Sequence, residues 1–85
     1  MTSLWYLYIV RCADSSLYTG ITTDLERRIS EHNSSKLGSK YTRARRPVEL
    51  VYHELFGNRS TVSAREAEIK KMTPAQKRTL IQSSI

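Results

Sequence analysis

Cysteine is almost missing from this sequence of 85 residues, in which Cys12 is the only one. A lone cysteine excludes an internal disulfide, and with only two histidines it leaves the four-ligand zinc patterns unfilled. Long apolar runs are missing as well. The stretch 4–10 is too short to cross a bilayer, and neither a basic leader nor a small-residue cleavage site accompanies it. We therefore expect a cytoplasmic protein with no membrane partner, in which Cys12 is a buried thiol.

The chain is also short, because 85 residues lie near the lower limit at which a polypeptide buries enough surface to fold without disulfides or metals. A chain of this length has room for one hydrophobic core. We therefore expect a single domain over residues 1–85.

Basic residues are abundant: 14 Lys and Arg stand against 8 Asp and Glu, which gives a net charge of +6 and a pI near 9.8. The excess is concentrated between residues 36 and 46, where no acid occurs. Such a stretch predicts a polyanionic partner, most commonly nucleic acid, although a merely soluble basic surface would have the same composition. An aromatic residue among cations suits stacking on an unpaired base as well as packing. The candidate nucleic-acid-binding residues are Lys36, Lys40, Tyr41, Arg43, Arg45 and Arg46.

Two segments near the start of the chain have the composition of β-strands. Residues 5–11 are aromatic and β-branched, and residues 17–20 resume an extended pattern after the turn-forming sequence 13–16. We expect the two segments to pair as a hairpin. Because side chains alternate along a strand, Tyr8 should face one side of the sheet and Leu7 the other.

A helix is predicted after the hairpin. Residues 22–24 supply candidate N-caps for a helix that ends near residue 33, and its apolar face includes Leu25 and His32. The segment that follows, 34–47, has few apolar residues and is long for a loop in so small a domain. We expect this segment to be functional or disordered.

A third strand and two more helices complete the pattern. Residues 48–56 are rich in Val, Leu, Tyr and Phe, as in a strand. Ser60 can cap a helix over about 61–72, and Thr73 and Pro74 are typical of the start of another. The expected fold class is α+β: a small three-stranded, largely antiparallel sheet flanked by helices, in the order β-β-α-β-α-α.

Four side chains are expected to meet beside the hairpin. Tyr8 and Tyr18 lie on its two strands, and Arg28 and His32 lie one turn apart on the first helix. Tyrosines can transfer protons and an arginine can clamp a phosphate, so the combination predicts cleavage of phosphodiester bonds. A tyrosine base would need a metal ion or Arg28 nearby to stabilise its phenolate. Each residue also has an ordinary interpretation: a strand aromatic, a solvated arginine, or a histidine cation at a helix C-terminus.

One acid is predicted on the buried face of the second helix. Val62, Glu66 and Ile69 recur at i, i+4 and i+7, so a carboxylate lies in the middle of an apolar stripe. A buried carboxylate needs a cation, and a divalent ion such as magnesium would meet that need. The alternative is that Glu66 lies at the rim of the stripe, where it pairs with Lys70 or closes a capping box with Ser63.

The sequence resembles a known family at these residues. Tyr6-Leu7-Tyr8 and Tyr18-Thr19-Gly20 are similar to the two tripeptides that name the GIY-YIG nuclease superfamily, and Arg28 follows Tyr18 at the spacing of that pattern. The resemblance is strongest to the small stand-alone bacterial proteins of the YhbQ type. It extends over about residues 4–81, which should contain the core of the domain. Further matching segments are Trp5-Tyr6-Leu7-Tyr8-Ile9-Val10, Lys40-Tyr41-Thr42 and Arg46-Pro47-Val48.

The resemblance implies a divalent-metal-dependent endonuclease that hydrolyses phosphodiester bonds in nucleic acid, with DNA favoured over RNA and a role in the repair or processing of structured DNA. Tyr18 or Tyr8 would help to deprotonate a water molecule, and Arg28 would stabilise the charge on the phosphate. Glu66 would hold a single Mg²⁺ or Mn²⁺ ion. His32 stands where family members carry a histidine or a tyrosine.

Some alternatives stay open in this family comparison. Glu68 is a second candidate for the metal ligand, although it lies off the apolar stripe. The chain would also fit a non-catalytic nucleic-acid-binding module of the same fold, or an interaction module whose basic face binds an acidic protein. Affinity for a substrate would come from the domain itself, from a protein partner or from self-association.

Overall fold

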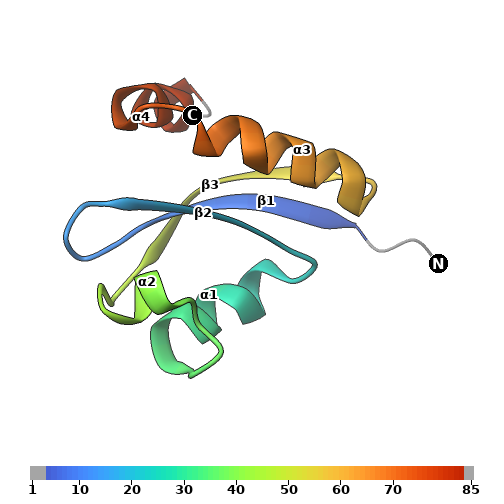
Figure 1. The fold of residues 1–85 in the computed structure, drawn as a ribbon. Coiled ribbons are helices and arrows are strands. Elements are labelled where there is room, and N and C mark those ends of the chain that lie inside the picture. Colours follow the sequence, from blue (N-terminus) through green and yellow to red (C-terminus); the bar gives the residue numbers. More distant parts are fainter. Residues whose placement is uncertain (1–3, 84–85) are drawn as a thin grey trace.

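The computed structural model describes residues 4–83, and over this range the chain forms three strands and four helices (Figure 1). None of these helices is long and apolar enough to cross a membrane. In chain order the elements are β1 (Trp5–Arg11), β2 (Leu17–Thr22), α1 (Leu25–Ser34), α2 (Lys40–Arg43), β3 (Glu49–Phe56), α3 (Arg59–Lys70) and α4 (Pro74–Ser83).

The strands form one antiparallel sheet in the order β2-β1-β3, so that β1 lies in the middle. Tyr8 on β1 is opposite Gly20 on β2 and His53 on β3. A register shift between Ile9 and Val10 interrupts the pairing with β3. The predicted hairpin, the α+β class and the order of the main elements are confirmed, and the short helix α2 is an addition to that order.

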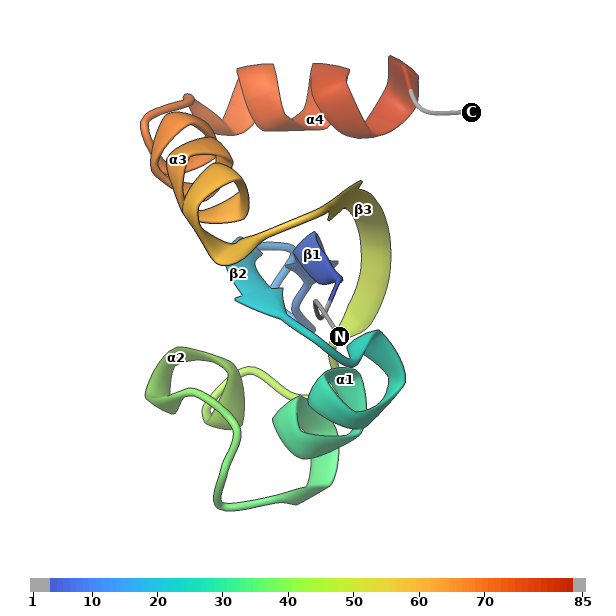
Figure 2. The same cartoon turned by 90° about the vertical axis from the view of Figure 1, so that its right-hand side faces the viewer.

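Helices cover both faces of the sheet, as Figures 1 and 2 show: α3 and α4 on one face, α1 and α2 on the other. Leu7 and Ile9 of β1 pack with Val62 of α3 in a core of fully buried side chains. Each such side chain stabilises the fold by roughly 1.5–3 kcal/mol. The alternate residues of β1 face α1, where Tyr8 joins a second buried cluster that includes the free thiol of Cys12. The alternation of β1 therefore directs a tyrosine hydroxyl toward α1.

Side-chain caps set where the helices begin. Asp24 caps α1 by accepting a hydrogen bond from a first-turn amide, and Thr73 does the same for α4, as the sequence predicts. The prediction for α3 was wrong, because Asn58 rather than Ser60 is the cap. The Asn58 Oδ1 atom accepts from the amide of Thr61 at 2.9 Å, so the helix begins earlier, at Arg59.

The segment 34–47 contains the helix α2 and is fastened to α1, so it is ordered. The guanidinium of Arg46 donates three hydrogen bonds to carbonyl groups at the C-terminal end of α1, among them a bond of 2.6 Å to the carbonyl of His32. The carbonyls of Glu31 and Ser35 each also accept a backbone amide, from Ser35 and Gly38 respectively. A cation at the C-terminal end of a helix is favoured by the helix dipole. The side chain of Asn33 donates to the carbonyl of Val48 and accepts from its amide, which anchors the far end of the segment.

Candidate functional site

Tyr8 places its hydroxyl over the edge strand β2. The side chain is 1% exposed, and a Cβ atom at Gly20, the residue opposite on β2, would lie 2.4 Å from the Tyr8 hydroxyl oxygen. Any larger residue at position 20 would force the ring away. Gly20 therefore provides the space in which the phenol lies.

His32 of α1 forms a hydrogen bond with the Tyr8 hydroxyl. The Tyr8 oxygen is 2.7 Å from Nε2 of His32, while Nδ1 is 2.8 Å from the Thr42 hydroxyl and 3.5 Å from the backbone N–H of Ser39. Because that N–H donates to Nδ1, we assign the ring proton to Nε2, which then donates to the Tyr8 oxygen. The helix α2 thus fixes the orientation of the imidazole.

His32 is neutral at physiological pH. The side chain is fully buried, and burial, assisted by the positive charge of Arg28, lowers the pKa of His32 from 6.5 to about 4. The interpretation of His32 as a cation at the helix C-terminus is therefore wrong. A neutral imidazole can hold the phenol of Tyr8 without adding charge to the site.

Tyr8 stays protonated for the same physical reason. Burial raises the pKa of Tyr8 to about 12; Arg28 opposes the shift, and the charges of Tyr18 and Glu66 add to it. The phenol of Tyr8 on β1 is therefore influenced by charged groups from three other elements: β2, α1 and α3. The hydroxyl of Tyr8 is a hydrogen-bonding group at neutral pH, and it is a poor base.

Arg28 supplies the permanent charge of the site. Its Nη1 atom donates to the Glu31 carboxylate at 2.9 Å and to the carbonyl of Leu37 at 2.6 Å, and the side chain is only 23% exposed. Burial favours the neutral form, but the bond to Glu31 and the nearby Tyr8 outweigh it, so the pKa of Arg28 is raised. The guanidinium is therefore positioned before any ligand binds.

An aromatic stack leads outward from the buried site. The ring of Tyr18 meets the His32 ring edge-on at 5.4 Å and stacks on the ring of Tyr41 at 5.9 Å. The guanidinium carbon of Arg45 lies 3.8 Å from the centre of the Tyr41 ring, and Arg45 is held there by Asp14. Tyr18, Tyr41 and Arg45, called here the outer stack, join the edge of the sheet to α2.

The basic residues between 36 and 46 divide into two kinds. Lys36, Lys40 and Arg43 are exposed, and no ion pair engages them within the described part of the chain. Arg45 and Arg46 are half-buried and are already bound, to Asp14 and to the end of α1 respectively. The sequence could not distinguish these two kinds, because a run of cations does not reveal which of them have internal partners.

Glu66 lies on α3, in the other helix layer, and its charge acts on the Tyr8 phenol. Its side chain is 22% exposed, and one carboxylate oxygen is 3.2 Å from the ammonium of Lys70, so the predicted alternative pairing is present. Glu68 is far more exposed and pairs with Arg65. Among residues 4–83 no group of three or more His, Cys, Asp or Glu could hold a metal ion. A hard divalent ion at Glu66 would therefore need waters and a substrate phosphate as its other ligands, a donor set that suits Mg²⁺.

Comparison with known proteins identifies the class. A family model described as the GIY-YIG catalytic domain matches residues 4–79, which is most of the chain. The match defines a domain of a nuclease superfamily. The chain belongs to the GIY-YIG family.

Relatives that align over most of this chain support this assignment. A UPF0213 protein of Desulfotalea psychrophila is 59% identical over 94% of this chain and 73% of its own length, and one of Syntrophus aciditrophicus is 52% identical over 93% and 91%. The solution NMR structure of a UPF0213 protein of Bacillus halodurans has a TM-score of 0.60 at 40% identity, covering 93% of this chain and 83% of that one. An NMR structure from E. faecalis has a TM-score of 0.64 at 40% identity and covers 98% and 90%.

The burial of neutral His32 predicts a loss of stability in mild acid. The unfolded chain binds a proton at this histidine near pH 6.5, whereas the folded chain resists it until about pH 4. The stabilisation is complete above pH 6.5 and is lost as the pH falls toward 4, by up to about 3 kcal/mol. Urea unfolding at pH 7 and pH 5 should show the loss, and His32→Gln should remove most of it. An equal loss in the variant would contradict the assigned protonation.

Proposed function

We propose that this protein is a divalent-metal-dependent endonuclease that hydrolyses phosphodiester bonds in DNA. The observation that carries the proposal is the convergence of Tyr8, Tyr18, Arg28 and His32, in which a buried neutral histidine holds a phenol beside a fixed guanidinium. Hydrolysis of a phosphodiester needs a base for water and positive charge for the phosphate. Two tyrosines and Arg28 are suited to those tasks.

Tyr18 is the better candidate for the base. The phenol of Tyr8 has a pKa of about 12 and already accepts a hydrogen bond from His32, so its part is to orient the neighbouring groups. Tyr18 is only half-buried and stands at the edge of the sheet, where water and substrate can reach it. To act as a base it must first release its hydroxyl proton to the surrounding water, and positive charge nearby favours that release.

The reaction then follows from these positions. A water molecule attacks the phosphorus and gives a proton to the Tyr18 phenolate. The bond from phosphorus to the leaving oxygen breaks, and that oxygen keeps the bonding electrons and takes a proton from solvent. Arg28 presents a planar fork of N–H donors to the phosphate oxygens and is charged throughout. A bound Mg²⁺ or Mn²⁺ ion would neutralise negative charge on the phosphate and assist the leaving oxygen. Glu66 is the residue that would hold it.

The exposed cations supply affinity for the DNA backbone. Lys40 and Arg43 lie on α2 with Tyr41, and Lys36 lies in the loop before it. None of the three has an ion pair in the described range, so they are available to phosphates. Contacts of this kind read charge rather than base sequence. We propose a cytoplasmic enzyme that acts on structured DNA, as in its repair or processing.

A second candidate function is a nucleic-acid-binding module that does not cleave. The observation in its favour is the ion pair between Glu66 and Lys70, which occupies one oxygen of the carboxylate that would hold the metal. A metal ion would have to displace the ammonium or use the other oxygen. Binding and cleavage must therefore be measured separately.

Removing the proposed base should separate the two functions. Tyr18→Phe loses one hydroxyl, so DNA affinity should be unchanged while cleavage slows by roughly 10² to 10⁴. Arg28→Lys keeps the charge but loses the planar fork and should also bind normally and cleave poorly. Tyr6→Phe and Arg27→Lys are the matched controls, because the Tyr6 ring contacts His53 of β3 rather than His32, and the Arg27 side chain is 60% exposed. The measurement is cleavage of one labelled duplex with Mg²⁺ or Mn²⁺, beside its binding in EDTA.

The assignment of the base would be wrong if Tyr18→Phe cut as fast as Tyr6→Phe; the role would then pass to Tyr8. Absence of cleavage by the wild-type protein on every DNA tested, with binding intact, would favour the binding module.

Glu66→Gln tests the metal ligand. The substitution keeps the size of the side chain and removes its charge, so cleavage should be lost at all Mg²⁺ and Mn²⁺ concentrations up to millimolar. DNA binding in EDTA should not change. Glu68→Gln is the control, because that carboxylate is exposed and pairs with Arg65. Wild-type cleavage by the Glu66 variant, or loss in the Glu68 variant alone, would transfer the role away from Glu66.

A further inference from the structure

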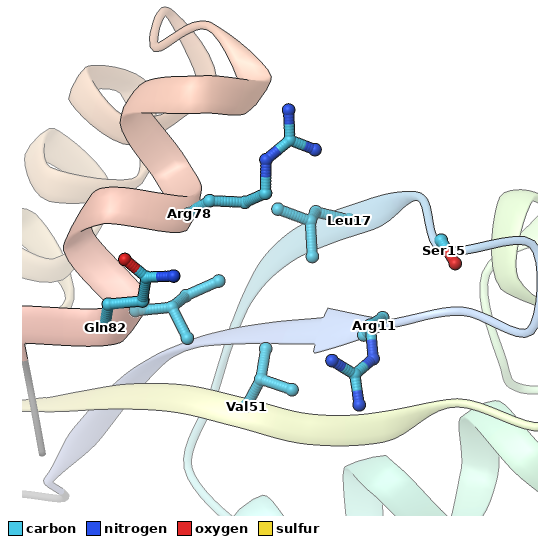
Figure 3. A pocket seen from close by; sticks show the side chains of 7 residues that line it. Arg11, Ser15, Leu17, Val51, Arg78 and Gln82 are labelled. Carbon is cyan, nitrogen blue, oxygen red and sulfur yellow. The ribbon is translucent and has the colours of Figure 1, made fainter.

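The molecule has a second concave region on the side of the sheet covered by α4. A cavity of about 330 Å³ lies there. Figure 3 shows its lining: Arg78 and Gln82 of α4 lie opposite Leu17 of β2, with Arg11 and Val51 along the strands. Its wall is therefore partly apolar and carries arginines. None of these residues belongs to the site described above.

A neighbouring cavity of about 340 Å³ continues from the first. It shares Ser15, Leu17 and Arg78 with that cavity, and it extends to Lys77 of α4 and to Tyr41 of α2. The turn between β1 and β2 lies between α2 and α4 in Figure 1, so the two cavities pass around the end of the hairpin. Together they form one groove, called here the hairpin groove.

The hairpin groove begins at the proposed cleavage site. Tyr41, at one end, is part of the outer stack that leads from Tyr18, and Asp14 of the groove holds Arg45 against the Tyr41 ring. A strand that leaves the site over the outer stack therefore enters the groove without crossing another element.

The charges in the groove favour a polyanion at its α4 end. Asp14 is neutralised by Arg45, and Arg11 by Glu49. Lys77 and Arg78 have no ion pair in the described part of the chain, so their charges are available. Two available cations beside an apolar wall provide contacts for phosphates and for the faces of unpaired bases. A duplex keeps its bases stacked inside and could not use that wall.

We propose that the hairpin groove binds an unpaired DNA strand that leaves the cleavage site, with Lys77 and Arg78 on its phosphates. This proposal rests on the proposed nuclease function and specifies its substrate class: a duplex that carries a single-stranded extension or flap. The strand runs from the outer stack past the hairpin turn to α4.

The test compares binding of two labelled DNAs in EDTA: a blunt duplex, and the same duplex with a single-stranded extension. Lys77→Gln with Arg78→Gln should abolish the preference for the extended DNA and leave binding of the blunt duplex unchanged. For single-stranded DNA the double variant should lose about 1.4 from the logarithmic salt slope, since each phosphate contact contributes roughly 0.7. When the salt concentration rises from 50 to 200 mM, the affinity of the wild-type protein for single-stranded DNA should therefore fall by a factor about seven times larger than the affinity of the double variant.

The matched control is Arg59→Gln with Lys71→Gln, which removes the same charge from exposed residues outside the groove. Equal effects of the two double variants would overturn the proposal, as would an unchanged preference for the extended DNA. A loss of affinity for both DNAs alike would show that the groove binds duplex, which also overturns it. Since these are binding measurements without metal, failure of the nuclease function would appear separately, as absent cleavage by the wild-type protein.

Discussion

The hydrogen bond between Tyr8 and His32 joins the sheet to α1, and the geometry of the site depends on it. Its two atoms are 2.7 Å apart, and both side chains are almost completely buried. The bond needs space above β2, which Gly20 provides, and a fixed imidazole, which Thr42 of α2 provides. Arg46 in turn fastens the segment that carries α2 to the end of α1. A buried polar pair is stable only when each partner is satisfied, so these residues form one unit.

Burial also determines which side chains of the site are charged and which are neutral. Burial favours the neutral forms of Tyr8 and His32, while Glu31 keeps Arg28 charged despite its partial burial. A permanent positive charge therefore stands beside neutral donors and acceptors, an environment that favours an anion. Glu66 of α3 adds a negative charge that acts on Tyr8. A phosphate with a divalent ion would complement both charges.

Much of the fold could be predicted because its signals are local. Alternation in β1 and the cap at Asp24 follow directly from neighbouring residues. The helix α2 could not be predicted in the same way, because four residues are too few to show a helical period, and its only local sign is the N-cap Ser39. The candidate site could be located through its tyrosines and Arg28, but its supports could not. Arg46, for example, binds the end of α1 through tertiary contacts. A run of basic residues in the sequence does not show whether such a residue binds DNA or another part of the protein.

The most direct test of this account is a two-dimensional ¹⁵N–¹H NMR spectrum of the His32 ring, recorded from pH 7.5 down to pH 4. The account predicts a neutral imidazole with its proton on Nε2 down to about pH 5, and protonation only near pH 4. Tyr8→Phe should alter the Nε2 signal more than the Nδ1 signal. An imidazolium already present at pH 6.5, or a proton on Nδ1 at neutral pH, would contradict the arrangement on which the site is built.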